Sequence, residues 1–98
     1  MPDNYFVISV DRATGDELNN VQNVIKENAN GWWHRHTNVW IVGGGSASKW
    51  RDLIKPALPS RDSSVLVIKL PSEDADRSWA FSGKDASAKC KWFHENYK

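Results

Sequence analysis

An acidic residue closes the first apolar stretch of the chain. Residues 5–10 read as a strand, and Asp11 follows them directly before a turn-like segment at 12–15. A carboxylate at a strand end is held by the sheet and stays open to water, metal or a partner. Mg²⁺ prefers oxygen ligands and needs only one or two protein carboxylates when phosphate oxygens supply others. Asp11 is therefore the candidate catalytic residue and metal ligand, and the alternative is a turn-initiating aspartate that bonds the backbone two residues on.

Two arginines are the candidate contacts to nucleic acid or to a protein partner. Arg12 directly follows Asp11, and Arg35 lies in the aromatic segment WWHRH at 32–36. Guanidinium groups suit phosphates because they donate paired hydrogen bonds, and exposed tryptophan rings can stack on bases. The six tryptophans are scattered over predicted strands and helices, which favours packing in the core and at a dimer interface instead.

Three other patterns carry little chemistry. His34 and His36 alternate on one strand face, but a structural zinc site needs four ligands and no fourth is evident. The glycine run at 43–45 leads from strand to helix without the Lys-Ser/Thr pair that a phosphate loop requires. The single Cys90 excludes an intrachain disulfide and a multi-cysteine metal site.

Hydrophobic periodicity predicts the elements that position these residues. The strand at 5–11 leads into a helix that begins at Asp16 and ends near residues 28–31. Its apolar side chains recur at helical spacing, namely Leu18, Val21, Val24 and Ile25.

A hairpin follows the first helix. Residues 32–42 supply its two strands, joined at 37–38. After the glycine run, Ser46 or Ser48 caps a second helix, which Pro56 bends or frays.

The clearest strand of the chain, at 64–70, completes a β-α-β-β-α-β order. This order predicts an α+β protein, a ferredoxin-like sandwich with an antiparallel sheet and two helices on one face. Residues 1–71 form the core of this single domain. The C-terminal extension, 72–98, is predicted to hold a short edge strand at 79–81 and a helix at 85–97.

Both faces of the predicted sheet are largely apolar. In the first strand, one face carries Phe6, Ile8 and Val10, and the other carries Tyr5, Val7, Ser9 and Asp11. The helices cover one face, so a second subunit or the C-terminal segment is expected to cover the other. A homodimer is the structural expectation.

Charge and composition exclude a broad preference for nucleic acid, because the formal net charge is +1. The distribution is uneven, however. Residues 3–27 hold five acids and two bases, whereas 49–61 hold four bases and one acid, which suits a dimer with complementary surfaces or a modest phosphate-contacting patch. The chain has one thiol, no basic secretory start and no apolar run near the roughly 20 residues of a membrane span. We therefore expect a cytoplasmic protein without membrane contact.

Four segments occur in an order that resembles one known family: YFVISVD at 5–11, GWWH and VWIV at 31–34 and 39–42, VLVIKL at 65–70, and WAFS at 79–82. They are similar to the small bacterial proteins labelled SinR family. Those proteins are related in fold to the CRISPR-associated small endoribonuclease of spacer acquisition and to VapD. The most specific part is the Trp-Trp-His hairpin with its returning Trp40. The label does not imply a transcriptional regulator, since no helix-turn-helix pattern is visible.

The resemblance implies a ferredoxin-like protomer that dimerises through its sheet. In the nuclease relatives, the aspartate closing the first strand comes from both subunits and holds a divalent metal near the dimer axis, a role that maps onto Asp11 only. The relatives commonly carry Tyr-Asp there, whereas this chain has Val10 before the aspartate. Two hypotheses follow. One is a dimeric Mg²⁺-dependent endonuclease acting on RNA or DNA, and the other is a catalytically silent dimeric binding or adaptor protein.

Overall fold

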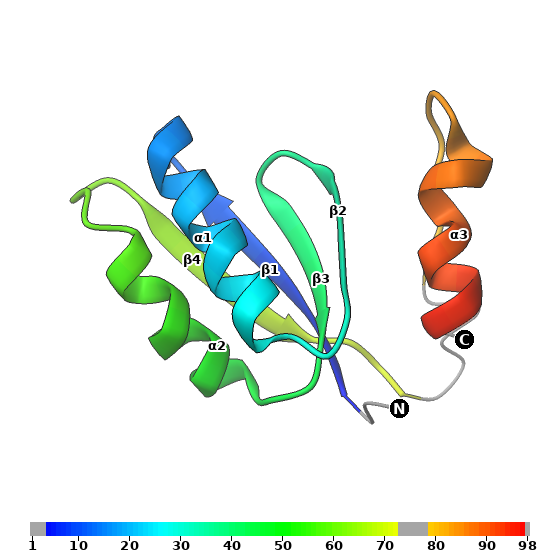
Figure 1. Ribbon diagram of the computed structural model, residues 1–98, viewed down its shortest axis with the longest axis horizontal. Coiled ribbons are helices and arrows are strands. Elements are labelled where there is room, and N and C mark those ends of the chain that lie inside the picture. Colours follow the sequence, from blue (N-terminus) through cyan, green and yellow to red (C-terminus); the bar gives the residue numbers. More distant parts are fainter. Residues whose placement is uncertain (1–3, 73–78, 98) are drawn as a thin grey trace.

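Four antiparallel strands form one sheet in the order β2-β3-β1-β4. The computed structural model describes residues 4–72 and 79–97, whose arrangement is shown in Figure 1. The strands are β1 (Tyr5–Asp11), β2 (Trp32–His36), β3 (Val39–Gly43) and β4 (Ser64–Lys69). Because the sheet is antiparallel and is accompanied by helices, the prediction of an α+β protein is confirmed.

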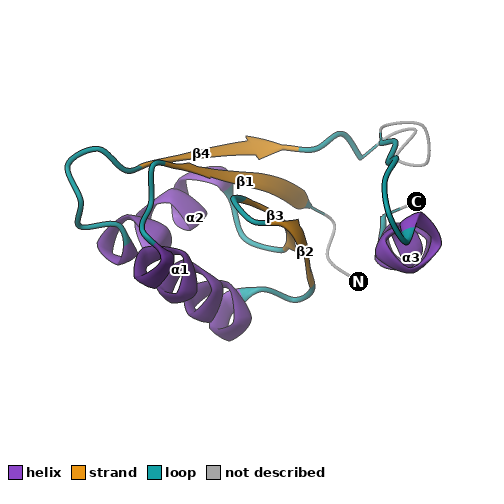
Figure 2. Ribbon diagram, turned by 90° about the horizontal axis from the view of Figure 1, so that it is seen from above, coloured by secondary structure: helices purple, strands orange, loops and turns teal. Residues whose placement is uncertain are grey.

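Three helices accompany the sheet. They are α1 (Gly15–Asn28), α2 (Ala47–Ile54), which continues into the 3₁₀ turn η1 (Lys55–Ala57), and α3 (Ala86–Asn96). Figure 2 shows α1 and α2 side by side on one face of the sheet, with α3 apart from that layer. None of these described helices has the length and apolar character needed to span a bilayer.

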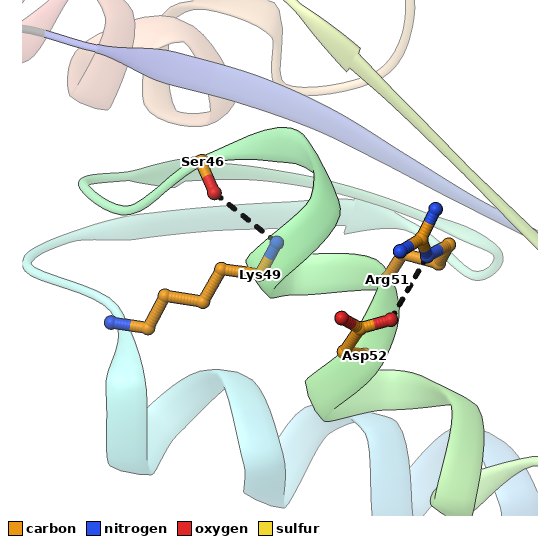
Figure 3. A network of polar contacts seen from close by, with 4 residues as sticks. All are labelled: Ser46, Lys49, Arg51 and Asp52. Carbon is orange, nitrogen blue, oxygen red and sulfur yellow. Dashed lines mark hydrogen bonds and ion pairs between the residues drawn. The ribbon is translucent and has the colours of Figure 1, made fainter.

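The second helix begins at one of the two predicted caps and ends before the proline that was predicted to bend or fray it. The Ser46 hydroxyl, rather than that of Ser48, caps α2 by accepting a hydrogen bond from the Lys49 backbone N–H at 3.2 Å (Figure 3). The α-helical pattern ends at Ile54, and Pro56 lies in the following 3₁₀ turn. Proline lacks the N–H that the next helical hydrogen bond requires, which explains the stop.

The glycine run between β3 and α2 forms a tight turn. Gly44 and Gly45 have φ angles of 88° and 80°, a region that side chains with a Cβ rarely adopt. A Cβ on Gly44 would lie 2.6 Å from Nδ2 of Asn30. The Gly44 carbonyl also accepts a hydrogen bond from Nε1 of Trp50 at 2.8 Å. These glycines therefore permit a left-handed strand-to-helix turn and leave room for the side chains of Asn30 and Trp50.

The main core lies between the sheet and the layer of α1 and α2. Its buried members come from two strands, β1 and β3, and from both helices: Phe6, Ile8, Val10, Val21, Ile25, Trp40, Val42, Trp50 and Ile54. Phe6, Ile8 and Val10, which were predicted to share one face of β1, all lie in this core. The period-two pattern of this strand is therefore confirmed.

A second, aromatic cluster covers part of the opposite face. Its buried members join β1, β2 and β3 to α3: Tyr5, Trp33, Ile41, Phe93 and Tyr97. Nε1 of Trp33 donates to the Lys89 carbonyl at 2.7 Å, and the Tyr97 hydroxyl donates to the Pro71 carbonyl. The C-terminal segment thus covers this end of the second face, as one of the two predicted covers.

The rest of that face is open in a single chain. Leu66 and Ile68 of β4 are 58% and 53% exposed. Their register partners on β1 are Ser9 and Val7, which are only partly buried. An apolar strip of the sheet therefore runs beside β1 without a covering element among the described residues.

The prediction of a short edge strand at 79–81 is wrong. Residues 79–84 contain no strand; instead, Trp79 stacks on Phe93 with ring centroids 4.6 Å apart. Phe81 lies edge-on to Trp33 at 6.4 Å. Both rings enter the same aromatic cluster, so their backbone does not alternate as a paired strand would. Residues 73–78, also in the predicted extension, lie outside the described residues.

Candidate functional site

Asp11 is the last residue of β1 and is exposed. It pairs across the sheet with Ser64, the first residue of β4. Because side chains alternate along a strand, Asp11 lies on the open face with Val7 and Ser9. Over residues 4–72 and 79–97, its carboxylate has no hydrogen bond or ion pair to another residue. The group is therefore accessible to an outside ligand.

The backbone beside Asp11 is held from both sides. On one side, Val10 donates its N–H to the Asn38 carbonyl at 2.9 Å, and Nδ2 of Asn38 donates to the Val10 carbonyl at 3.1 Å. On the other side, the β1–β4 pairing reaches Ser64. The turn of the β2–β3 hairpin therefore extends the sheet up to the residue before the candidate ligand.

Arg12 adopts an unusual backbone conformation next to Asp11. Its φ is 56°, in the left-handed region, and its side chain is exposed. This conformation costs a residue with a Cβ roughly 1–2 kcal/mol. It turns the chain sharply from β1 toward the N-cap of α1 at Thr14. Residues strained in this way cluster at functional sites.

Arg35 does not join Asp11. It lies on β2, an edge strand of the sheet, and β3 separates β2 from β1. Instead, Arg35 lines a cleft between β2 and α3 together with Trp32 and Trp92. The two predicted arginine contacts therefore belong to different surfaces.

The histidines pack against aromatic rings. His34 stacks on Trp40, with ring centroids 4.3 Å apart and planes 16° apart. His36 contacts the rings of Trp33 and Phe81. In the described parts of the chain, no group of three or more His, Cys, Asp or Glu residues is arranged to hold a metal ion. The prediction that His34 and His36 share a strand face is wrong: His34 contacts Trp40 of the main core and His36 contacts the aromatic cluster on the opposite face, because the register of β2 is irregular between Trp33 and His36.

A cationic groove follows the junction of α2 and β4. Two adjoining hollows of about 340 and 400 Å³ share Arg51 and Val65, and the second also includes Lys55 and Ser64. Figure 3 shows Arg51 paired with Asp52, at 3.0 Å between Nε and Oδ1. That hydrogen bond and the opposite charge raise the pKa of Arg51. Arg51 and Lys55 therefore line the same groove as Ser64, the strand partner of Asp11.

Glu17 holds the loop before β4, a role not identified from its sequence position. Its carboxylate accepts from the Thr14 backbone N–H at 3.0 Å and from the Ser60 hydroxyl at 2.7 Å. These bonds, in that order, lower the pKa of Glu17 to about 2. The Thr14 hydroxyl accepts from the Glu17 N–H in return. This capping box could have been found from Thr and Glu three residues apart, but the partner at Ser60 could not.

Comparison of the chain with protein-family models gives no match, and comparison with curated proteins gives none either. Assignment of a function therefore depends on the geometry described above and on the sequence motifs.

Proposed function

We propose that the protein is a homodimer of ferredoxin-like protomers that acts as a Mg²⁺-dependent endonuclease on RNA or DNA. Asp11 of each copy would hold the metal. The observation that carries this proposal is the position of Asp11. Its exposed carboxylate ends β1 on the same sheet face as the uncovered Leu66 and Ile68. A contact between two copies through that face would involve both Asp11 strand ends.

The element order supports the ferredoxin-like assignment. Two β-α-β units alternate along the chain, the sheet order is β2-β3-β1-β4, and the neighbouring strands are antiparallel. These are the features of the split β-α-β arrangement. The motif order that resembles the SinR-labelled proteins favours the same fold and the same aspartate.

The dimer proposal is supported by the uncovered part of the sheet. Leu66 and Ile68 are more than half exposed, and apolar side chains that adjoin on a surface commonly mark contacts between proteins. Most homodimers use one self-complementary patch around a two-fold axis. The strip of β4 and β1 is a candidate for such a patch, because the exposed apolar side chains of Leu66 and Ile68 from both copies would be brought together there.

The residues at the strand end fit a magnesium ion only when two copies contribute. Each chain offers one exposed carboxylate there, whose oxygens suit Mg²⁺. A bound Mg²⁺ would polarise the scissile phosphate and promote attack by water. Arg12 beside Asp11, and Arg51 and Lys55 in the cationic groove, are suited to hold the phosphate backbone.

A catalytically silent binding or adaptor dimer is the second candidate. It is favoured because the His, Cys, Asp and Glu residues of the described chain form no group of three or more that could hold a metal ion. It would use the same sheet face for dimerisation and the same cationic groove for a partner. The two candidates differ only in whether Asp11 supports cleavage.

Nuclease assays separate the candidates. Labelled RNA and DNA are incubated with Mg²⁺ or Mn²⁺ and with the parent, Asp11→Asn or the control Glu27→Gln, which alters an exposed carboxylate on α1. We expect cleavage by the parent and Glu27→Gln and a loss of at least about 100-fold with Asp11→Asn, since acid–base and metal groups contribute on this scale. Equal cleavage by all three proteins, or by none, would rule out the nuclease.

Light scattering tests the dimer separately. The parent should have about twice the 11.1 kDa mass of one chain. Leu66→Lys should shift the mass toward the monomer, whereas the control Asn23→Lys adds the same charge on the exposed side of α1 and should not. A monomeric parent at micromolar concentration would refute the paired Asp11 site.

A further inference from the structure

A cleft of about 490 Å³ lies between β2 and α3, away from the Asp11 strand end. Its walls combine aromatic and basic side chains, chiefly Trp32, His34, Arg35, Lys89, Lys91 and Trp92. The volume falls within the roughly 300–1,000 Å³ range of ligand sites in proteins. Since β2 is an edge strand, the cleft follows a border of the sheet with no neighbouring strand.

Two tryptophans are held in place on opposite walls. Trp32 packs against the main core, whereas Trp92 packs against the aromatic cluster of the other face. Trp92 lies edge-on to Tyr5 at 5.7 Å, and its indole lies beside Gly31. Both indoles remain partly exposed. They therefore offer fixed aromatic surface to a ligand without a large loss of side-chain freedom.

Basic side chains exceed acidic ones around these rings. Arg35, Lys89 and Lys91 line the cleft, and Nζ of Lys26 lies 5.9 Å from the ring centroid of Trp32. Glu95 is the acidic lining residue, and it lies 3.8 Å from Lys91 in an exposed ion pair. Such a pair contributes little because solvent screens it. The cleft therefore suits a ligand that carries both ring systems and negative charge.

We infer that this cleft binds single-stranded nucleic acid, with bases stacked on Trp32 and Trp92 and phosphates contacted by Arg35 and Lys91. Stacking platforms beside basic side chains are the usual means of holding single strands. Bases in a duplex already stack on one another, so their faces are not free for indoles. The inference rests on the proposed function in one respect only, namely that the bound single strand would be the substrate of the nuclease. Binding in the cleft does not require Asp11 or metal.

Binding is measured by fluorescence anisotropy with short labelled oligouridylate and oligothymidylate in EDTA, so that cleavage cannot interfere. Trp92→Leu should weaken binding by about 5- to 150-fold, which is the 1–3 kcal/mol attributed to one stacked base. Arg35→Gln should weaken binding and reduce the slope of log affinity against log salt by about 0.7. The control Arg61→Gln removes an exposed positively charged side chain in the turn before β4 and should leave that slope nearly unchanged.

Two competitors test the assignment of the ligand. A duplex of the same length and polyglutamate both carry negative charge without exposed base faces, so neither should compete at the concentration where the single strand saturates. Circular dichroism of each variant checks folding, and Arg35→Gln, on the surface, keeps the test valid if Trp92→Leu is misfolded. Unchanged affinity in folded Arg35→Gln, or equal competition by polyglutamate, would overturn the inference.

The outcomes distinguish this site from the proposed nuclease. Tight binding by parent and Asp11→Asn with no cleavage by either would leave the cleft intact and remove the nuclease. Cleavage that depends on Asp11 but is unaffected by Trp92→Leu and Arg35→Gln would support the nuclease and remove the cleft as the site that binds its substrate.

Discussion

The two faces of the sheet differ in how they are covered. Side chains of β1 that meet α1 and α2, such as Ile8, are fully buried within one chain. On the other face, α3 covers the end at Tyr5 and Trp33, and Leu66 and Ile68 stay exposed. One face thus completes a core, and the other combines packing with accessible surface. Both the candidate Asp11 site and the proposed dimer contact lie on the second face.

The largest effect is expected on the helix-covered face. Trp40 is fully buried there, so Trp40→Ala should lower the free energy of unfolding by about 3–5 kcal/mol through lost burial and a residual cavity. Urea denaturation followed by circular dichroism measures the change. A loss below about 1 kcal/mol would mean that this face is not the main source of stability.

A smaller effect is expected where α3 covers the second face. Trp33→Phe removes the donor to the Lys89 carbonyl and part of a buried ring. We expect a loss of about 1–3 kcal/mol, because a partly buried carbonyl is left without its partner. Amide hydrogen exchange, compared with the parent, should be accelerated more in α3 than in α1. Equal acceleration of both helices would indicate that the two cores unfold as one unit.

The contact between the first turn of α1 and the loop before β4 should respond to acid. The pKa of Glu17 is lowered to about 2 in the folded protein, against an ordinary value of 4.5. The ionised carboxylate therefore contributes stability that is fully present above about pH 4.5 and is lost as pH falls toward 2. Glu17→Gln should be less stable than the parent at pH 7, and the difference should shrink at pH 2–3. Thermal unfolding of both proteins between pH 2 and pH 7 measures this difference in stability. A difference that does not change with pH would contradict the lowered pKa of Glu17 in the folded protein.

The smallest effect is expected at the exposed strip. Leu66→Ala removes a side chain that is 58% exposed, so the unfolding free energy of the monomer should change by no more than about 0.5 kcal/mol. Dilution to concentrations where light scattering gives the monomer mass isolates this value. If the dimer forms through this strip, the same substitution should weaken association at higher concentration. A large loss in the monomer would instead assign Leu66 to the core.

The sequence predicts the helix-covered side well because its signals are local. Alternation in β1 identifies which side chains share a face, the serines before and in α2 include its cap, and Pro56 marks where its α-helical pattern is disrupted. These features depend on residues a few positions apart, where periodicity and capping rules apply directly.

The second face was predicted less completely because its contacts join distant segments. Trp79 and Phe81 alternate as in a strand, yet their rings enter a cluster with Trp33 and Phe93. The cleft needs Trp32 and Trp92 to meet across 60 positions. Glu17 accepts a hydrogen bond from Ser60, which lies 43 positions further along the sequence. No local rule identifies such partners, whereas the position of Asp11 at the end of β1 follows from a local signal.

The two hydrogen bonds between Asn38 and Val10 have a consequence for any ligand of Asp11. They immobilise the main chain one residue before the carboxylate, so little backbone entropy remains to be lost when a cation or a partner binds there. The tip of β1 is in this sense preorganised. Replacing Asn38 with alanine would loosen it without altering a single charge.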